Sequence, residues 1–233
     1  DSIARELNER RYMRILNSLT EFAKRFKGRV VSLNVAREVL GEHCVVVPAL
    51  VKEIETMYSK AHFEYVADEN KKGEQWVLVY HIDMSMWKTF EAHPTSFSKA
   101  SVWDLHPTWL DEKLKKGFRL INLRGVKSEK LEQRIAELKK KGIECAPAKI
   151  GTITQALIEM ERTQGTNKSK TRYFCGEAVA AQITPVIGGH DKDGLLLYTL
   201  PFDIGSPAQC PKIGVVLCII PLRSLIQLKA PTT

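Results

Sequence analysis

The basic side chains of this chain are concentrated between residues 113 and 141. Eleven Lys and Arg residues lie there against three Glu residues, so the net charge of this stretch equals the +8 of the whole chain. Ammonium and guanidinium groups gathered in this way are typical of a surface that binds phosphate groups. The alternative is a lysine-rich helix face that contacts only solvent. The basic residues are Lys113, Lys115, Lys116, Arg119, Arg124, Lys127, Lys130, Arg134, Lys139, Lys140 and Lys141.

Two short turns combine a glycine, a basic residue and a hydroxyl group, namely residues 124–128 and 149–152. Neither matches a P-loop or a dinucleotide-binding glycine motif. Backbone N–H groups at the start of a helix favour anions, so we predict that both turns contact phosphate, with ordinary turn formation as the alternative. The full set of predicted nucleic-acid contacts is Lys113, Lys115, Lys116, Arg119, Arg124, Lys127, Ser128, Lys130, Arg134, Lys149, Thr152, Lys71 and Lys72.

Catalytic residues are not assigned by any spacing in the chain. Carboxylates would support two-metal phosphoryl transfer only if the fold brought them together. Cys175 is expected to be the most exposed thiol, and the turn at His190 is expected to be solvated. We predict no metal and no cofactor, and a nuclease or phosphoryl-transfer enzyme is kept as the alternative function. The candidate carboxylates are Glu144, Glu177, Asp191, Asp193 and Asp203.

The elements that must position the basic stretch alternate between helix and strand. The pattern predicts a short helix over residues 107–116, a strand over 118–123 and a helix over 129–141 capped by Ser128. An extended run over 143–150 and a helix from Thr152 or Thr154 to residue 163 follow. This order predicts a parallel strand pair with a right-handed crossover, and places both helix starts at the carboxyl edge of the sheet.

The last part of the chain reads as three extended runs, over residues 172–187, 195–203 and 213–222, with the first interrupted near Gly176. Turn-forming residues separate them, so we predict an antiparallel meander. The third run is apolar on both faces, and we therefore expect it at the centre of the sheet or covered by helices.

In the N-terminal part, the spacing of apolar residues predicts helices over residues 3–27, 35–40 and 48–59. Strands over 62–67 and 75–82, joined by a turn at 68–73, are predicted to follow. In element order and length, residues 1–82 resemble the winged-helix superfamily. The resemblance implies that the helix at 48–60 enters the DNA major groove, but this helix is neutral, since two lysines face two glutamates. A winged helix that contacts protein is the alternative, and Lys71 and Lys72 would form the hairpin tip.

These elements predict an α/β (α+β) protein with a mixed sheet. The expected parts are a winged-helix-like module at residues 1–83, an ordered connecting strap at 84–108 and an α/β domain at 109–233. The parallel strand pair and the antiparallel meander are both expected in the last of these.

Composition supports a globular chain, because 44% of residues are hydrophobic and 27% are charged. No apolar run approaches the roughly 20 residues of a membrane span, so no membrane contact is predicted. Five cysteines without a CxxC pair and no leader-like start indicate the nucleus or cytoplasm. We expect the chain to be a fragment or processed product. We predict a nucleic-acid-binding protein, DNA or RNA, with an assembly subunit that binds protein as a further alternative.

Overall fold

The computed structural model describes residues 30–32, 39–44, 55–81, 84–98, 108–114, 117–164, 173–177, 184–191, 194–200 and 213–221. The strands are β1 (Val30–Ser32), β2 (Glu55–Ser59), β3 (Trp76–His81), β4 (Gly117–Val126), β5 (Cys145–Pro147), β6 (Tyr173–Cys175), β7 (Thr184–Asp191), β8 (Gly194–Leu200) and β9 (Ile213–Ile219). The α-helices are α3 (Lys60–Lys71), α4 (Met86–Ala92), α5 (Leu131–Lys140) and α6 (Ile150–Gln164). Short 3-10 turns are η1 (Gly41–His43), η3 (Pro94–Ser96), η5 (Thr108–Asp111) and η6 (Ser128–Lys130).

The main sheet has seven strands in the order β3-β4-β9-β6-β7-β8, with β5 also paired to β9. It is mixed, because β6 and β9 are parallel while the other strand pairs of this sheet are antiparallel. The predicted α+β class and mixed sheet are therefore confirmed. The predicted antiparallel meander is wrong in its last strand, since β7 and β8 pair antiparallel but β9 lies beside β6 and parallel to it. The central place of β9 also agrees with its sequence, since Val215, Val216 and Leu217 are all buried and successive side chains of a strand point to opposite faces.

The two strands of the predicted parallel pair run in the same direction, but they are not neighbours in the sheet. Both β4 and β5 run antiparallel to β9, and both Leu120 and Cys145 lie opposite Ile219. The two strands are thus parallel in direction, but β9 lies between them. A strand-helix-strand order indicates direction alone, and the most apolar strand takes the position that is buried on both faces.

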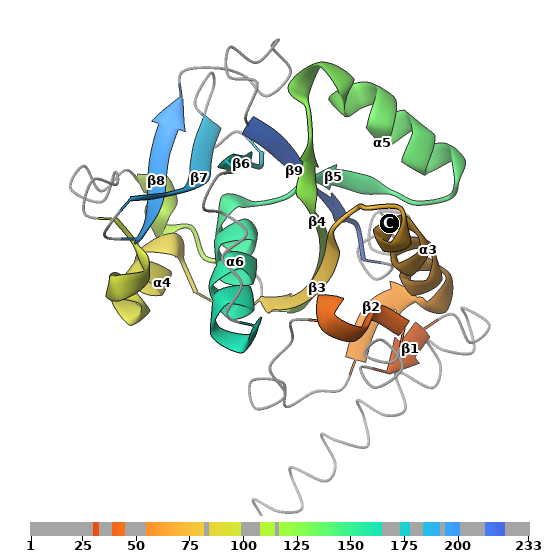
Figure 1. The fold of residues 1–233 in the computed structure, drawn as a ribbon, viewed down its shortest axis with the longest axis horizontal. Helices are drawn as coiled ribbons and strands as arrows, with labels where there is room; N and C mark the ends of the chain where they lie inside the picture. Colours follow the sequence, from red (N-terminus) through yellow and green to blue (C-terminus); the bar gives the residue numbers. More distant parts are fainter. Residues whose placement is uncertain are drawn as a thin grey trace, which may run out of the picture.

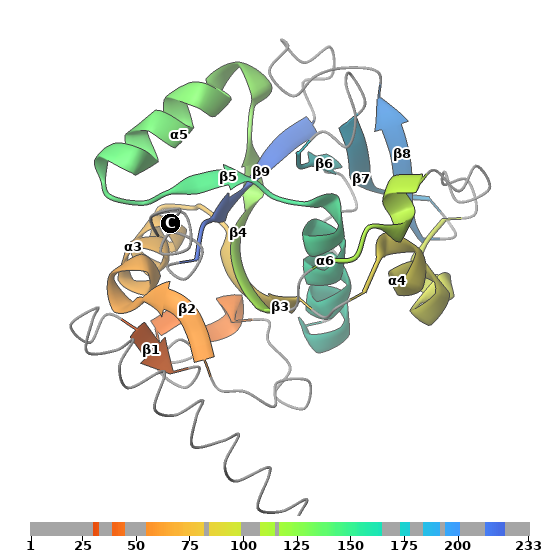
Figure 2. The same ribbon diagram turned by 180° about the vertical axis from the view of Figure 1, so that it is seen from behind.

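Helices cover both faces of the sheet. Buried side chains of α3 and α5, such as Phe63 and Leu138, pack on one face in a cluster with Leu120. Side chains of α6, such as Ile153, pack on the other face with Ile121. Figures 1 and 2 show α6 on one side of β3 and β4, with α3 and α5 on the other. None of the helices in the described ranges is long and apolar enough to cross a membrane.

In the region from residue 55 to 71, helix and strand are exchanged relative to the prediction. Residues 55–59, predicted as helix, form β2, which pairs with β1, and residues 62–67, predicted as strand, lie in α3. Ser59 begins α3 with a capping box, in which its Oγ accepts from the backbone N–H of His62 at 3.2 Å. The predicted turn at 68–73 is mostly the end of this helix, so no hairpin forms there and β3 pairs with β4. Residues 3–27 and 48–54 lie outside the described residues.

The predicted boundary at residue 83 does not separate two cores. Six residues of β3 pair with β4, from Trp76 opposite Asn122 to His81 opposite Gly117. The buried Tyr58 hydroxyl donates to the Ile219 carbonyl at 2.9 Å and accepts from the Leu120 N–H at 3.0 Å. The described parts of residues 1–83 and 109–233 therefore share one core.

The segment at residues 84–98 is ordered against this core. Ser85 caps α4, and Met86 and Phe97 are buried with the side chains of α6. The Ser98 N–H donates to the Leu195 carbonyl at 2.8 Å, which joins the segment to β8. The predicted helix at 107–116 is seen only as the single turn η5, while Lys115 and Lys116 lie outside the described residues.

Candidate nucleic-acid interface

The structure brings four of the predicted contact residues around one hollow of about 470 Å³ between the end of β4, η6 and α5. These are Arg124, Lys127, Lys130 and Arg134, and the rim also carries Glu74, Gln133 and Glu137. We call this hollow the basic basin. Its cations come from one continuous stretch of chain that changes direction at the end of β4.

That change of direction depends on Gly125, which lies inside β4 with φ at 74°. A Cβ at this position would lie 2.8 Å from the Cα of Gly214 on β9. Any side chain would therefore clash with the neighbouring backbone as well as adopt an unfavourable conformation. The register of β4 on β9 shifts between Asn122 and Val126, and this irregularity carries the chain out of the sheet into η6.

A buried asparagine holds two of the residues that line the basin. Asn122 is 1% exposed. Its Oδ1 accepts from the Arg124 N–H at 3.0 Å, and its Nδ2 donates to Glu74 at 2.8 Å. The Arg124 guanidinium in turn donates to the Gly73 carbonyl at 2.7 Å. Asn122 was missed by sequence reasoning, although a single polar residue within an otherwise apolar strand is the signal that could have found it.

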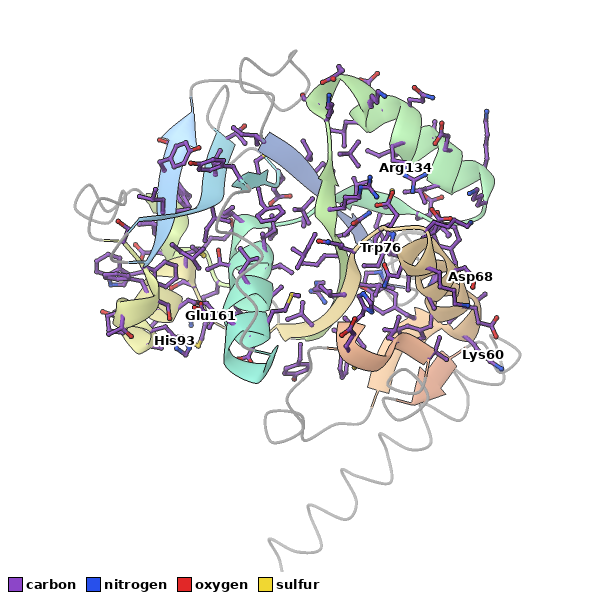
Figure 3. All side chains as sticks on the ribbon, in the orientation of Figure 1. Lys60, Asp68, Trp76, His93, Arg134 and Glu161 are labelled. Atoms are coloured by element: carbon purple, nitrogen blue, oxygen red, sulfur yellow. The ribbon has the colours of Figure 1, made fainter. Side chains whose placement is uncertain are left out.

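Arg134 lies in the basin, but carboxylates surround its guanidinium. Glu69 lies 3.2 Å away, Glu137 3.6 Å and Glu74 3.9 Å. Burial would lower the pKa of Arg134, but hydrogen bonding to Glu69 and the nearby negative charges raise it overall. Figure 3 shows Arg134 projecting from α5 toward α3. This residue therefore fastens two helices together, and its acidic partners on α3 and the following turn were not predicted.

Glu69 is the most buried of these carboxylates, with 11% of its side chain exposed. Burial would raise its pKa, but hydrogen bonds from Lys72 and Arg134 lower it overall. Lys72 pairs with Glu69 at 3.0 Å and Lys71 with Asp68 at 2.9 Å. The two predicted hairpin-tip lysines therefore lie at the end of α3, with their charges already paired.

Lys127 and Lys130 differ from Arg134, because they are exposed and have no ion-pair partner among the residues described. The predicted Ser128 cap between them is wrong. Ser128 is the first residue of the turn η6, the α-helix begins three residues later at Leu131, and no side chain caps either start. Arg124, Lys127 and Lys130 are thus the cations of the basin that no carboxylate of the described residues holds.

The second predicted turn lies elsewhere. Lys113, Arg119, Lys149 and Thr152 line a separate hollow of about 440 Å³, which we call the Lys149 pocket. It shares no lining residue with the basic basin, and its helix α6 covers the opposite face of the sheet from α5. Because β4 and β5 run in the same direction, both helices begin beyond the same ends of their strands. However, α5 and α6 cover opposite faces of the sheet, so the two turns line separate hollows.

The charge of Lys149 is neutralised within its pocket. The Lys149 ammonium lies 2.6 Å from Glu112 and 2.8 Å from Glu177. Burial would lower the pKa of Lys149, but the hydrogen bonds that its ammonium donates to both carboxylates raise it overall. The Arg119 guanidinium donates to the Phe118 carbonyl at 2.8 Å. Thr152, predicted as a possible cap, is buried within the first turn of α6.

The catalytic candidates do not converge in the described part of the chain. Glu177 lines the Lys149 pocket, Asp191 ends β7, and Glu144 precedes β5. Asp193 and Asp203 lie outside the described residues. No group of three or more His, Cys, Asp or Glu side chains within the described ranges is placed to hold a metal ion.

The thiols in the core are not activated nucleophiles. Cys175, predicted to be exposed, is 1% exposed, and burial raises its pKa to about 12. Burial also raises the pKa of Cys145 and of Cys218 to about 11. The thiolate is the nucleophilic form, so these three side chains stay protonated and unreactive near neutral pH.

Comparison of the chain with protein-family models, with curated proteins and with solved structures gave no match. The chemistry of the basic basin and of the Lys149 pocket is therefore what bears on function.

Proposed function

We propose that this protein binds nucleic acid through backbone phosphates at the basic basin. The observation that carries the proposal is the convergence of Arg124, Lys127 and Lys130 on one hollow of about 470 Å³. Lys127 and Lys130 are exposed and, within the described ranges, not engaged by a carboxylate. Arg124 is held in place by the Gly73 carbonyl and the network around Asn122.

Phosphate is the ligand class that best fits these three groups. A planar guanidinium can form two parallel hydrogen bonds to phosphate oxygens, and flexible ammonium groups add charge around it. The two acidic residues on the rim, Glu74 and Glu137, are held by Asn122 and by Gln133 and Arg134. They restrict an anion to the side of the basin where the three cations lie.

The test is a salt titration of binding to labelled DNA and RNA. Three phosphate contacts on a duplex predict that log affinity falls with log salt concentration with a slope of about −2.7 or steeper. The double variant K127Q/K130Q should bind about tenfold more weakly at low salt and reduce the slope by about 1.8.

A matched control keeps the same charge change away from the basin. Lys60 and Lys88 are exposed and form surface ion pairs with Glu64 and Glu91, both at 3.6 Å. The variant K60Q/K88Q should bind within twofold of the unmodified protein, which is roughly the scatter of such contacts. Equal losses in the two double variants, or no salt-dependent binding at all, would contradict the proposal.

A phosphoryl-transfer enzyme is the second candidate. The observation in its favour is that Glu112 and Glu177 lie on either side of Lys149 in a pocket of about 440 Å³. Magnesium in such enzymes is often held by one or two carboxylates together with substrate phosphates. Incubation of labelled DNA, RNA and nucleotides with Mg²⁺ tests this candidate, since E177Q should abolish any hydrolysis while leaving binding at the basic basin unchanged.

A further inference from the structure

Cations gather at both ends of α5. The basic basin lies at its N-terminal end, with Arg124, Lys127 and Lys130. Lys139, Lys140 and Lys141 lie at its C-terminal end and are all exposed. The sequence alone joins these residues into one basic stretch, whereas the structure divides them into two groups.

Between the two groups, the part of α5 that continues the rim of the basin carries acidic and amide side chains, and its one arginine, Arg134, is held by carboxylates. Glu132 and Gln133 are exposed, and Glu137 is held by Gln133 at 2.9 Å and by Arg134 at 3.6 Å. Residues three or four positions apart share a helix face. Gln133, Glu137 and Lys140 or Lys141 therefore follow one another along the face that begins at the basin.

The separation of the groups has the scale of a duplex groove. A ten-residue helix such as α5 is about 15 Å long. The major groove of B-form DNA is about 12 Å wide, and the minor groove of A-form RNA is also wide. The two ends of α5 are thus spaced to meet two backbones, with its acidic and amide side chains over the groove between them.

Base stacking has no counterpart in the basin. Proteins that grip single strands combine a basic groove with aromatic side chains on which bases stack. Among the residues that the structure describes, none that lines the basin is aromatic. The nearby Tyr65 is half-buried, and the Lys141 ammonium lies over its ring, 5.3 Å from the centroid.

From these observations we infer that the preferred ligand is a double-stranded nucleic acid, with α5 lying across a groove and its two cationic ends on the two phosphate backbones. This inference rests on the proposed function at the basic basin. A single strand that followed α5 from one cationic group to the other would pass its phosphates over Glu132 and Glu137. It would therefore be held at one end only.

The test compares binding of labelled duplex DNA, duplex RNA, single-stranded DNA and single-stranded RNA of one sequence across a salt series. Five phosphate contacts on a duplex predict a slope of about −4.5, and three contacts on a single strand predict about −2. We expect at least one of the duplexes to bind tenfold or more tightly than either single strand. Comparison of duplex DNA with duplex RNA shows whether α5 prefers the major groove of B-form DNA or the minor groove of A-form RNA.

The variant K139Q/K140Q isolates the second contact, and it leaves Lys141 on the ring of Tyr65. For the preferred duplex, the slope should fall in magnitude by about 1.8, while single-strand binding should change less than twofold. Circular dichroism would verify that α5 is retained.

Single strands that bind as tightly as duplexes, or duplex binding unaffected by K139Q/K140Q, would overturn the inference while leaving the basin as a phosphate site. Absence of salt-dependent binding to all four ligands would overturn the proposed function and the inference with it.

Discussion

The basic basin and the Lys149 pocket begin from similar sequences and differ in what their cations contact. Each follows a strand, contains a glycine and a lysine, and precedes a helix. At the basin, Lys127 and Lys130 are exposed with no ion-pair partner in the described ranges. In the pocket, Lys149 lies between Glu112 and Glu177. A basic residue therefore provides binding charge only where the fold leaves it unpaired.

Within the basin a second contrast separates Arg134 from its neighbours. Its side chain is 21% exposed, and its guanidinium contacts three carboxylates, one of them mostly buried. Removing one partner of a buried ion pair is strongly destabilising, because the other charge stays buried without a partner, whereas exposed ion pairs contribute little to the free energy of unfolding. Arg134 and Lys149 should thus both be structural, but with different contributions to the free energy of unfolding.

The largest expected effect is on stability in R134M. Removal of the guanidinium leaves Glu69 with Lys72 as its one ion-pair partner among the described residues. It should reduce the free energy of unfolding by about 2–3 kcal/mol, somewhat less than for a fully buried pair. Urea denaturation measures the change. R124M, which alters an exposed arginine, serves as control and should lose less than about 1 kcal/mol. Similar losses of unfolding free energy in R134M and R124M would contradict the view that Arg134 joins two helices while Arg124 is available to bind a ligand.

The next effect concerns nucleic-acid affinity. Charge reversal in K127E/K130E should weaken duplex binding by more than tenfold at low salt, because two phosphate contacts become repulsions. K149Q should bind within about twofold of the unmodified protein, since Lys149 is already neutralised. Anisotropy titrations at equal salt measure both. A larger loss of affinity in K149Q than in K127E/K130E would indicate that nucleic acid binds at the Lys149 pocket instead of the basic basin.

A third effect is the pH dependence of stability. The pKa of Glu69 is lowered in the folded state from its ordinary value of 4.5. Its stabilising contribution is therefore complete above that value and is lost as pH falls through the lower folded-state pKa. E69Q should be about 1–2 kcal/mol less stable at neutral pH, with a shallower loss of stability toward about pH 3. Unfolding curves at several pH values test this, and an unchanged slope would exclude Glu69 as a contributor.

The smallest expected effect is the stability change in K149M. Its carboxylate partners are 52% and 43% exposed, so solvent screens both interactions. The free energy of unfolding should fall by only about 0.5–1 kcal/mol, several times less than in R134M. A thermal melt of both variants in one buffer makes the comparison, and equal losses would show that the two clusters are energetically alike.

Local patterns in the sequence were sufficient for several elements. The apolar residues on both faces of β9 predicted its central position, and the spacing of Leu131 and Leu138 predicted the helix α5. The location of the charge between residues 113 and 141 was also a property of sequence alone. These features depend on burial and periodicity within one segment, which a single stretch of residues is enough to specify.

The reversal of residues 55–71 shows where local patterns were insufficient. Phe63 and Tyr65 alternate as in a strand, but Phe63 and Val66 are the buried pair, at helical spacing. The capping box at Ser59 starts that helix, and pairing of β2 with β1 excludes residues 55–59 from it. Tertiary packing decided between two periodicities that the same short segment could satisfy.

Only the tertiary structure decided which charges are available. Strand order placed β9 between β4 and β5, and the two helices that follow those strands pack on opposite faces of the sheet. Carboxylates distant in sequence then meet some cations, as Glu69 meets Arg134 and Glu112 meets Lys149. The sequence determined how much positive charge the chain carries and where it lies, while long-range pairing, which no local pattern encodes, determined how much of it can face a ligand.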